Sequence, residues 1–293
     1  MSSLHLRPFQ YFEPKSIDEA IELLNTYGDT AQILAGGVDL IPRLRTGAIS
    51  ADTIINIQTI PELSYIKADG ADGLEFGAMA TLRSLELSLE LKRVYPAVYD
   101  AIHQLSSVQC KCMGTAVGNV CVATSASDVA TALMAVNSVL IVAGRNCRRR
   151  VPLAGFYTGY RRTALQRGEF VTGVLLPKPA RGEASTFMNL VRTHADIAKL
   201  AVGVSVLREN GVCKEARIAL GAVAPTVFRA DAAERVLRGQ ELSSAGIAAA
   251  AEAAAASTTP ITDFRSTDEY RREMTRVLVG RALTKAAAQA GRN

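Results

Sequence analysis

The sequence predicts an α+β protein whose two halves are built differently. In the first half, short apolar runs of strand length alternate with segments of helical periodicity, which is typical of an α/β arrangement. From Ser138 onward, several runs of strand composition follow one another with Gly-containing turns between them, which indicates an antiparallel sheet. The chain then closes with segments of helical composition.

The elements of the first half begin with a helix that carries its own start signal. Ser16 and Glu19 have the spacing of a capping box, in which both side chains accept from the first free N–H groups. The apolar residues that follow share one face, and Gly28 offers a left-handed stop. After this helix we expect strands at residues 32–35, 53–57 and 74–78, and helices at 82–91, 96–105 and 128–136.

The second half contains more strands and ends in helices. We expect strands at residues 138–143, 170–176, 186–192, 202–207 and 216–223, then helices at 230–237, 245–257 and from 266. Ser266 and Glu269 repeat the spacing of a capping box. A polar link that contains Pro and Gly, at residues 178–183, predicts a domain boundary. We therefore expect one domain over residues 1–178 and a second over residues 179–293.

The composition is that of a globular protein with a packed core, since 48% of the residues are hydrophobic and 21% are charged. No stretch approaches the roughly 18 consecutive apolar residues of a membrane span. The first residues have no apolar core of a secretory signal. Five cysteines, an odd number, do not suggest a disulfide framework. We expect a cytoplasmic protein with reduced thiols and no membrane partner.

The net charge of +5 raises the question of a nucleic-acid partner. The charges are dispersed, however, and the densest cluster is the short group Arg145, Arg148, Arg149 and Arg150. Tryptophan is absent and aromatic residues are only 5% of the chain, which disfavours a platform for stacked bases. We therefore interpret the arginine cluster as a solvated hairpin or a subunit contact, and expect no nucleic acid.

Residues 33–40 form the first segment that could bind a ligand. A short apolar strand ends at Gly36 and Gly37, and the chain restarts as a short helical turn. Glycines let the backbone approach a ligand closely, and successive free N–H groups make a concave site suited to phosphate. Taken alone, a strand that ends at a Gly pair is more often a simple turn.

Residues 114–119 form the second such segment, and Thr124, Ser125 and Asp128 follow it. Its Thr and Asn side chains can donate to phosphate oxygens, and Asp128 can accept from a ribose or ribityl hydroxyl. The alternative is a polar loop that caps the helix expected at 128–136, with Asp128 in the first turn of that helix.

Together and in this order, the two segments resemble the paired FAD-binding loops of molybdenum hydroxylase flavoproteins, which read approximately Ala-Gly-Gly-Thr-Asp-Leu and Gly-Thr-x-Gly-Gly-Asn. The resemblance covers nearly the whole chain and is strongest to the FAD-binding subunits of bacterial xanthine dehydrogenases. It includes residues 9–14, 61–63, 152–159, 197–199, 221–225 and 264–283.

The resemblance implies a vanillyl-alcohol-oxidase-type (PCMH-type) FAD-binding domain of two subdomains, divided near residues 55–65. A C-terminal α+β domain with an antiparallel sheet would follow. The FAD pyrophosphate would lie between the two loops, and the flavin ring would lie beside Leu105 and the strand near residues 172–174. The residues implied at the cofactor are Ile33, Leu34, Ala35, Gly36, Gly37, Val38, Asp39, Leu40, Leu105, Thr115, Gly118, Asn119, Thr124, Asp128, Thr172 and Val174.

The implied activity is electron transfer by bound FAD, with no acid or base required from the chain. The implied partners are a large subunit with the molybdenum cofactor and a small subunit with [2Fe–2S] clusters. The FAD would pass electrons to NAD⁺ or another acceptor, in a complex that resembles xanthine dehydrogenase and serves purine metabolism. The isolated chain would not hydroxylate a purine.

The chain departs from the family pattern at three positions. Val117 replaces the first Gly of the second loop, where a β-branched side chain resists positive φ and crowds a pyrophosphate. Val38 replaces a Thr and removes a hydroxyl donor. Met188 replaces a Lys near the flavin, which would weaken the stabilisation of anionic reduced flavin. These departures motivate an alternative function, that of an assembly subunit that has lost FAD.

A second alternative uses the thiols of Cys110, Cys112 and Cys121 as ligands of a metal or iron–sulfur electron carrier. A structural metal site needs four well-spaced ligands, and the sequence offers no evident fourth. Ordinary reduced thiols are therefore the favoured interpretation, and we expect no metal site.

Overall fold

The structure is a computed structural model that describes residues 6–69 and 73–290. The expectation about an N-terminal signal falls partly on residues 1–5, which lie outside the described residues. Among the residues that are described, no helix is both long and apolar enough to cross a membrane.

The chain begins with a small parallel sheet in the order β1-β3-β2. β3 pairs in parallel with both neighbours, and its four residues are buried. The connection from β1 to β2 runs through the helix α1, and β1 was not among the expected strands. The elements of this part are β1 (Gln10–Phe12), α1 (Ile17–Tyr27), η1 (Gly28–Thr30), β2 (Ala31–Leu34), α2 (Leu40–Arg45), β3 (Thr53–Asn56), η2 (Ile57–Thr59) and η3 (Pro61–Leu63).

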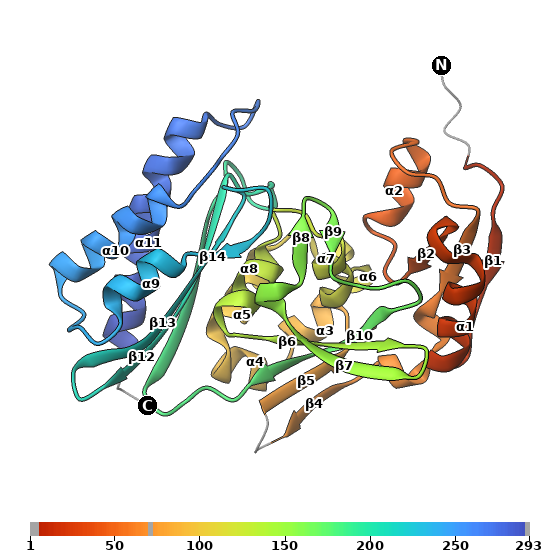
Figure 1. The fold of residues 1–293 in the computed structure, drawn as a ribbon, viewed down its shortest axis with the longest axis horizontal. Helices are drawn as coiled ribbons and strands as arrows, with labels where there is room; N and C mark the ends of the chain where they lie inside the picture. Colours follow the sequence, from red (N-terminus) through yellow and green to blue (C-terminus); the bar gives the residue numbers. More distant parts are fainter. Residues whose placement is uncertain (1–5, 70–72, 291–293) are drawn as a thin grey trace.

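A five-stranded antiparallel sheet follows in the order β4-β5-β10-β6-β7. Six helices are inserted between β5 and β6, and Figure 1 shows them between this sheet and the C-terminal part. The elements are β4 (Ile66–Asp69), β5 (Gly73–Gly77), α3 (Leu82–Glu86), α4 (Leu89–Val94), α5 (Pro96–Gln104), α6 (Val108–Met113), α7 (Ala116–Cys121), α8 (Asp128–Ala135), β6 (Val139–Gly144), β7 (Cys147–Pro152), η4 (Leu153–Gly155), β8 (Tyr157–Gly159), β9 (Arg162–Thr163) and β10 (Phe170–Pro177).

The C-terminal part is a four-stranded antiparallel sheet with helices, in the order β11-β12-β13-β14. The helices α9, α10 and α11 cover one face and bury a second hydrophobic core, while α5 and α8 pack against the other face (Figure 1). The elements are β11 (Glu183–Leu190), β12 (Leu200–Glu209), β13 (Val212–Gly221), β14 (Phe228–Arg229), α9 (Asp231–Leu237), α10 (Ser244–Ala256) and α11 (Asp268–Gln289).

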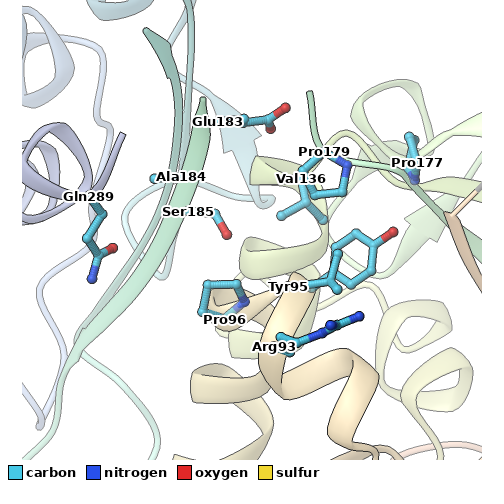
Figure 2. A pocket seen from close by; sticks show the side chains of 11 residues that line it. Arg93, Tyr95, Pro96, Val136, Pro177, Pro179, Glu183, Ala184, Ser185 and Gln289 are labelled. Carbon is cyan, nitrogen blue, oxygen red and sulfur yellow. The ribbon is translucent and has the colours of Figure 1, made fainter. Parts of the chain in front are cut away.

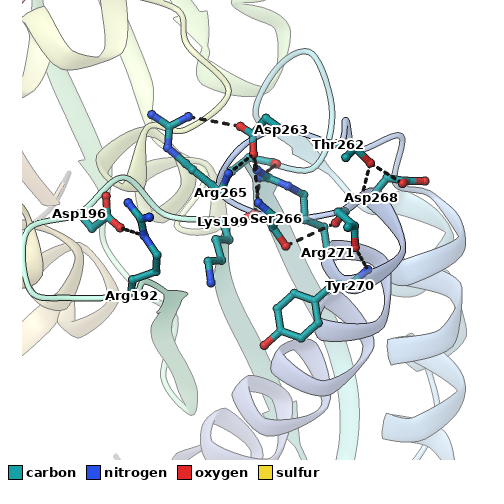
Figure 3. Close-up of polar contacts among 12 residues, drawn as sticks. Arg192, Asp196, Lys199, Thr262, Asp263, Arg265, Ser266, Asp268, Tyr270 and Arg271 are labelled. Atoms are coloured by element: carbon teal, nitrogen blue, oxygen red, sulfur yellow. Dashed lines mark hydrogen bonds and ion pairs between the residues drawn. The ribbon is translucent and has the colours of Figure 1, made fainter.

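One side chain of α11 fastens the loops of this C-terminal part. The buried guanidinium of Arg271 donates to the main-chain oxygens of Lys199 and Ala222, at 2.8 Å and 3.0 Å. It also pairs with Asp263 at 2.7 Å, and Figure 3 shows Asp263 and Lys199 on either side of it. Arg271 therefore joins the start of β12, the end of β13 and the loop before α11.

The structure corrects three expectations about elements. The helix expected at 82–91 is two helices, because the hydroxyl of Ser88 caps a new helix by accepting from the N–H of Leu91. The strands expected at 138–143 and 170–176 pair with each other, and the second of them also pairs with β5, so both belong to the five-stranded sheet. The last helix is capped by Thr267 and not by Ser266.

Two other local predictions are confirmed. The hydroxyl of Ser16 caps α1 by accepting from the N–H of Glu19 at 3.1 Å. The Glu19 carboxylate accepts from Lys15, one residue before the expected cap. The arginine cluster lies in the β6–β7 hairpin, at the outer edge of the five-stranded sheet, where Arg148 is exposed.

Helix α8 packs tightly against the C-terminal sheet because two strands carry glycine where they meet it. A Cβ on Gly203 of β12 would lie 2.8 Å from the main-chain oxygen of Thr131. A Cβ on Gly221 of β13 would lie 2.4 Å from the Thr131 hydroxyl. The main-chain N–H of Ala222 also donates to the Ser125 oxygen at 2.6 Å. The segment at the start of α8 is therefore held by the C-terminal part.

We predict that Gly203→Ala lowers the free energy of unfolding by about 1–3 kcal/mol, because the new methyl group forces α8 away from the sheet. Thermal melting of the full chain measures the effect. Gly280→Ala, in a helix where a Cβ would meet no atom closer than 3.9 Å, is the matched control and should not destabilise. Equal melting temperatures for Gly203→Ala and the wild type would contradict the close packing.

Candidate functional site

The two candidate loops, 80 residues apart in the sequence, contact each other through their backbones. A Cβ on Gly36 would lie 1.9 Å from the main-chain oxygen of Met113 and 2.9 Å from the Cα of Gly114. A Cβ on Gly114 would in turn lie 3.6 Å from the Val38 side chain. Only glycine allows the first loop to lie this close to the second.

The first loop presents main-chain donors that the protein does not use. None of the N–H groups of Gly36, Gly37, Val38 and Asp39 donates a hydrogen bond within residues 6–69 and 73–290. Gly37 has a φ of +70°, which turns the chain between β2 and α2. Successive N–H groups in such a turn form a concave site for an anion.

The side chains of the second loop are fixed by helix capping. Thr115 caps α7 by accepting from the N–H of Gly118 at 3.0 Å, so its own O–H is left to donate. Asn119 accepts from the hydroxyl of Ser127, so its NH₂ group is left to donate. Ser127 caps α8 by accepting from the N–H of Ala130. The cap interpretation of this loop is therefore correct, and it is compatible with ligand binding.

A hairpin that the sequence analysis did not single out joins the two loops. The Tyr157 hydroxyl donates to the main-chain oxygen of Val120, and the N–H of Arg161 donates to that of Ala123 at 2.8 Å. The Arg161 guanidinium lies 3.9 Å from the Asp39 carboxylate of the first loop. Arg161 has a φ of +55°, and its position in a tight turn between two short strands gave no clear sequence signal.

Asp128 lies in the first turn of α8 and is buried. One carboxylate oxygen accepts from the side-chain amide of Asn189 on β11 at 2.9 Å. The other, Oδ1, is buried and has no hydrogen-bond partner in the described part of the chain. Burial raises the pKa of Asp128 to about 6, against the lowering effect of the Asn189 hydrogen bond. An oxygen that is buried and unpartnered is suited to accept from a ligand hydroxyl.

The remaining implied residues differ in what they can offer. Leu105, at the end of α5, and Thr124 are half-buried. The Thr172 hydroxyl already donates to the main-chain oxygen of Ile141 at 3.2 Å. Val174 is fully buried in the larger hydrophobic core, which residues before the C-terminal part mainly form (the first core). Its strand is paired on both sides in the sheet. The Val174 side chain is therefore not available to a ligand.

The three departures from the family pattern do not obstruct the loops. Val117 lies inside α7 with its side chain in the first core, so the expected conflict with positive φ is wrong. Val38 is 44% exposed. Met188 packs against the second core, because alternation along β11 turns it to the face opposite Asn189.

The cysteines do not form a ligand set. Among the described residues, no three His, Cys, Asp or Glu side chains gather as metal ligands would. Cys110 and Cys112 lie on α6, whereas Cys121 packs against the first core, where burial raises its pKa to about 12. The alternative of a metal or iron–sulfur carrier built on these three thiols therefore has no structural support.

Lys111, between the two cysteines, forms a buried ion pair. Its Nζ lies 2.5 Å from the Glu86 carboxylate, which also contacts Arg83 and His103. Burial alone would raise the pKa of Glu86, but hydrogen bonds from Lys111, Arg83 and His103 outweigh it and lower the pKa to about 2. This pair joins α3 to the helix that leads into the second loop.

A separate cavity of about 290 Å³ lies where the start of α5 faces β11 (Figure 2). Its lining includes Tyr95, Pro96, Val136, Glu183 and Ser185, and no described residue of the two loops. It is therefore distinct from the candidate cofactor site.

Comparison with known families decides the assignment of this site. The model described as "FAD binding domain in molybdopterin dehydrogenase" matches residues 7–179. The chain belongs to the FAD-binding medium subunits of the molybdenum hydroxylases. The model described as "CO dehydrogenase flavoprotein C-terminal domain" matches residues 185–286. The fold is a PCMH-type FAD-binding domain followed by a C-terminal domain with an antiparallel sheet, as expected.

Similar medium subunits match over nearly their whole length. The carbon monoxide dehydrogenase medium chain of Afipia carboxidovorans is 32% identical, over 96% of this chain and 98% of the relative. The putative xanthine dehydrogenase FAD-binding subunit XdhB of Escherichia coli is 25% identical, over 96% and 97%. A solved structure of carbon monoxide dehydrogenase from Hydrogenophaga pseudoflava, 32% identical, matches with a TM-score of 0.94 over 98% of this chain and 99% of that chain.

The residues at the two loops fit the cofactor of this family, FAD. The free N–H groups of the first loop and the donors of Thr115 and Asn119 are of the kind that a pyrophosphate would accept from. The unpartnered Oδ1 of Asp128 is an acceptor that a hydroxyl of a ribityl or ribose group would suit. No cationic side chain is required for this fit.

We predict that Gly36→Ala weakens FAD binding by roughly tenfold or more, the effect of losing one hydrogen bond to a charged group, because its Cβ forces the two loops apart. Quenching of FAD fluorescence in a titration of apoprotein measures the dissociation constant. Gly155→Ala, where a Cβ meets no atom within 4 Å, is the control and should bind FAD like the wild type. Unchanged binding by Gly36→Ala would show that the contact between the loops is not needed.

We predict that Glu86→Gln destabilises the chain at pH 7 by roughly 3 kcal/mol, because it removes the carboxylate that pairs with the buried Lys111 side chain. The contribution of Glu86 is fully present above its unfolded pKa of about 4.3 and is lost as the pH falls towards its folded pKa of about 2. The difference in melting temperature between variant and wild type should therefore shrink below pH 4.3. Glu90→Gln, at an exposed ion pair, should show no such difference at any pH.

Proposed function

We propose that this chain is the electron-transfer subunit of a heteromeric molybdenum hydroxylase, and that its FAD receives electrons from [2Fe–2S] clusters. The proposal is supported by the juxtaposition of the two loops, whose main-chain and side-chain donors are left unused. Asn119 of the second loop bonds to Ser127, the neighbour of the buried Asp128. The family supplies the chemistry, because bound FAD exchanges electrons with one-electron and two-electron partners.

The residues of the chain bind and orient the cofactor and take no part as acid or base. In this proposal, residues 33–40 and Thr115, Gly118 and Asn119 hold the pyrophosphate. Thr124 and Asp128 hold the adjoining hydroxyl-bearing groups. Leu105 and the backbone at Thr172 and Val174 lie towards the flavin ring. The alternative function, that of an assembly subunit that has lost FAD, has no support from Val117, because this side chain is buried in the first core and away from the loop surface.

The proposed partners are a large subunit with the molybdenum cofactor and a small [2Fe–2S] subunit. The relatives are named as medium chains or subunits of enzymes for different substrates, including carbon monoxide, glyceraldehyde and nicotine. Such variety is expected where the substrate site lies in another chain. We propose a xanthine dehydrogenase-like complex with NAD as acceptor, supported by the match to XdhB, although the carbon monoxide dehydrogenase chains are more similar.

The arrangement along the chain is part of the proposal. The FAD-binding domain would extend over residues 1–178, with its two subdomains divided near 55–65, between the parallel and the antiparallel sheet. The C-terminal domain would extend over residues 179–293. The proposed location of the complex is the cytoplasm.

We predict that the purified full chain has the visible absorption spectrum of a flavin and that acid releases FAD from it. With xanthine and a dye acceptor, the chain alone should give no turnover, because the proposal puts the substrate site in the large subunit. The complex reconstituted with its large and small subunits should reduce NAD⁺ when a substrate is added. A colourless chain that takes up no FAD would contradict the proposed function, and turnover by the isolated chain would contradict the division of labour among subunits.

A further inference from the structure

We infer that Asn189, on the first strand of the C-terminal domain, is a positioning residue for the FAD site, because its amide holds the Asp128 carboxylate with one oxygen free for the cofactor. This inference rests on the proposed function, in which Asp128 contacts FAD. It assigns to the C-terminal domain a part in cofactor binding that acts through Asp128.

The direction of Asn189 follows from the alternation of side chains along β11. Phe187 lies in the first core and Met188 packs against the second, so odd-numbered positions face the FAD-binding domain. Asn189 takes the same face as Phe187, and its Nδ2 lies 2.9 Å from Oδ2 of Asp128. A strand gives a more rigid support than a loop would.

The hydrogen bond determines how the carboxylate is presented. A carboxylate rotates readily about its last torsion, so a buried one without a fixed contact has no unique orientation. Asn189 engages Oδ2, which leaves Oδ1 buried and unpartnered in the described part of the chain. Among the described residues, the Asn189 amide supplies the one side-chain hydrogen bond that the Asp128 carboxylate accepts.

The support beneath this pair is rigid as well. Helix α8 begins at Asp128 and is pressed against the sheet at Gly203 and Gly221. The Ser125 oxygen accepts from the N–H of Ala222 at 2.6 Å. The C-terminal sheet therefore contacts the backbone at the start of α8, where Asp128 lies, and also carries the Asn189 amide that orients the Asp128 side chain.

The test is a double-mutant cycle on FAD affinity in the full chain, with Asn189→Leu, Asp128→Asn and the double variant. Asn189→Leu should raise the FAD dissociation constant roughly tenfold, because a hydrogen bond to a charged group is lost. Asp128→Asn should raise it similarly. The double variant should be no weaker than Asp128→Asn alone, because Asn189 acts through Asp128. Melting of each apoprotein is measured in parallel.

The matched control is Thr186→Val, on the same strand. The Thr186 hydroxyl is buried and has no hydrogen-bond partner in the described residues, so the control should bind FAD like the wild type. If Asn189→Leu does not fold, Asn189→Ala replaces it in the cycle.

Three results would overturn the inference. Unchanged FAD affinity in Asn189→Leu would do so, and so would an equal loss of affinity in the wild-type and Asp128→Asn backgrounds, which indicates a purely structural role. Unchanged affinity in Asp128→Asn would remove Asp128 from the site while leaving the proposed function intact. A wild-type chain that binds no FAD is recognised at the first titration and would reject the proposed function itself.

Discussion

The contact between Gly36 and the backbone at Met113 and Gly114 is the constraint on which the rest of the site depends. The first loop follows a strand of a parallel sheet, and the second follows the helix α6, which packs on α3. Their main chains approach to a distance that no side chain would permit at Gly36. Two ion pairs then hold the loops in place. Arg161 of the hairpin pairs with Asp39 of the first loop, and Glu86 pairs with Lys111 of the helix before the second loop.

Helix caps in the second loop have two uses. A Thr or Asn that accepts from a helix N–H has its rotamer fixed, and its own donor is left pointing elsewhere. Thr115 shows this arrangement, because it accepts from the N–H of Gly118. Asn119 is fixed differently, by accepting from the hydroxyl of Ser127, which in turn caps α8. The hydrogen bonds that begin these helices therefore also orient the donors of the proposed cofactor site, so a loop that caps helices can also bind a ligand.

Much of the fold could be predicted because its signals are local. The cap at Ser16, the alternation of strands and helices, and the hairpin of the arginine cluster depend on residues close in sequence. The two loops were found through a family resemblance, and the structure explains their pairing by one glycine. Asn189, Arg161 and the pairing of β10 with β5 and β6 were not predicted, because each depends on contacts between residues far apart in the chain. Val174 was assigned by position on a strand, and burial of its side chain could not be inferred from that.

The outer edge of the five-stranded sheet affects how the chain behaves before it meets other subunits. An unpaired strand edge is a template on which another chain can add a strand, and a subunit that waits for its complex is exposed to that risk. Here β7 presents the exposed guanidiniums of Arg148 and Arg150 and ends at Pro152, which has no N–H to offer. Two copies that approached each other at this edge would bring like charges together, which disfavours aggregation of the unassembled chain through β7.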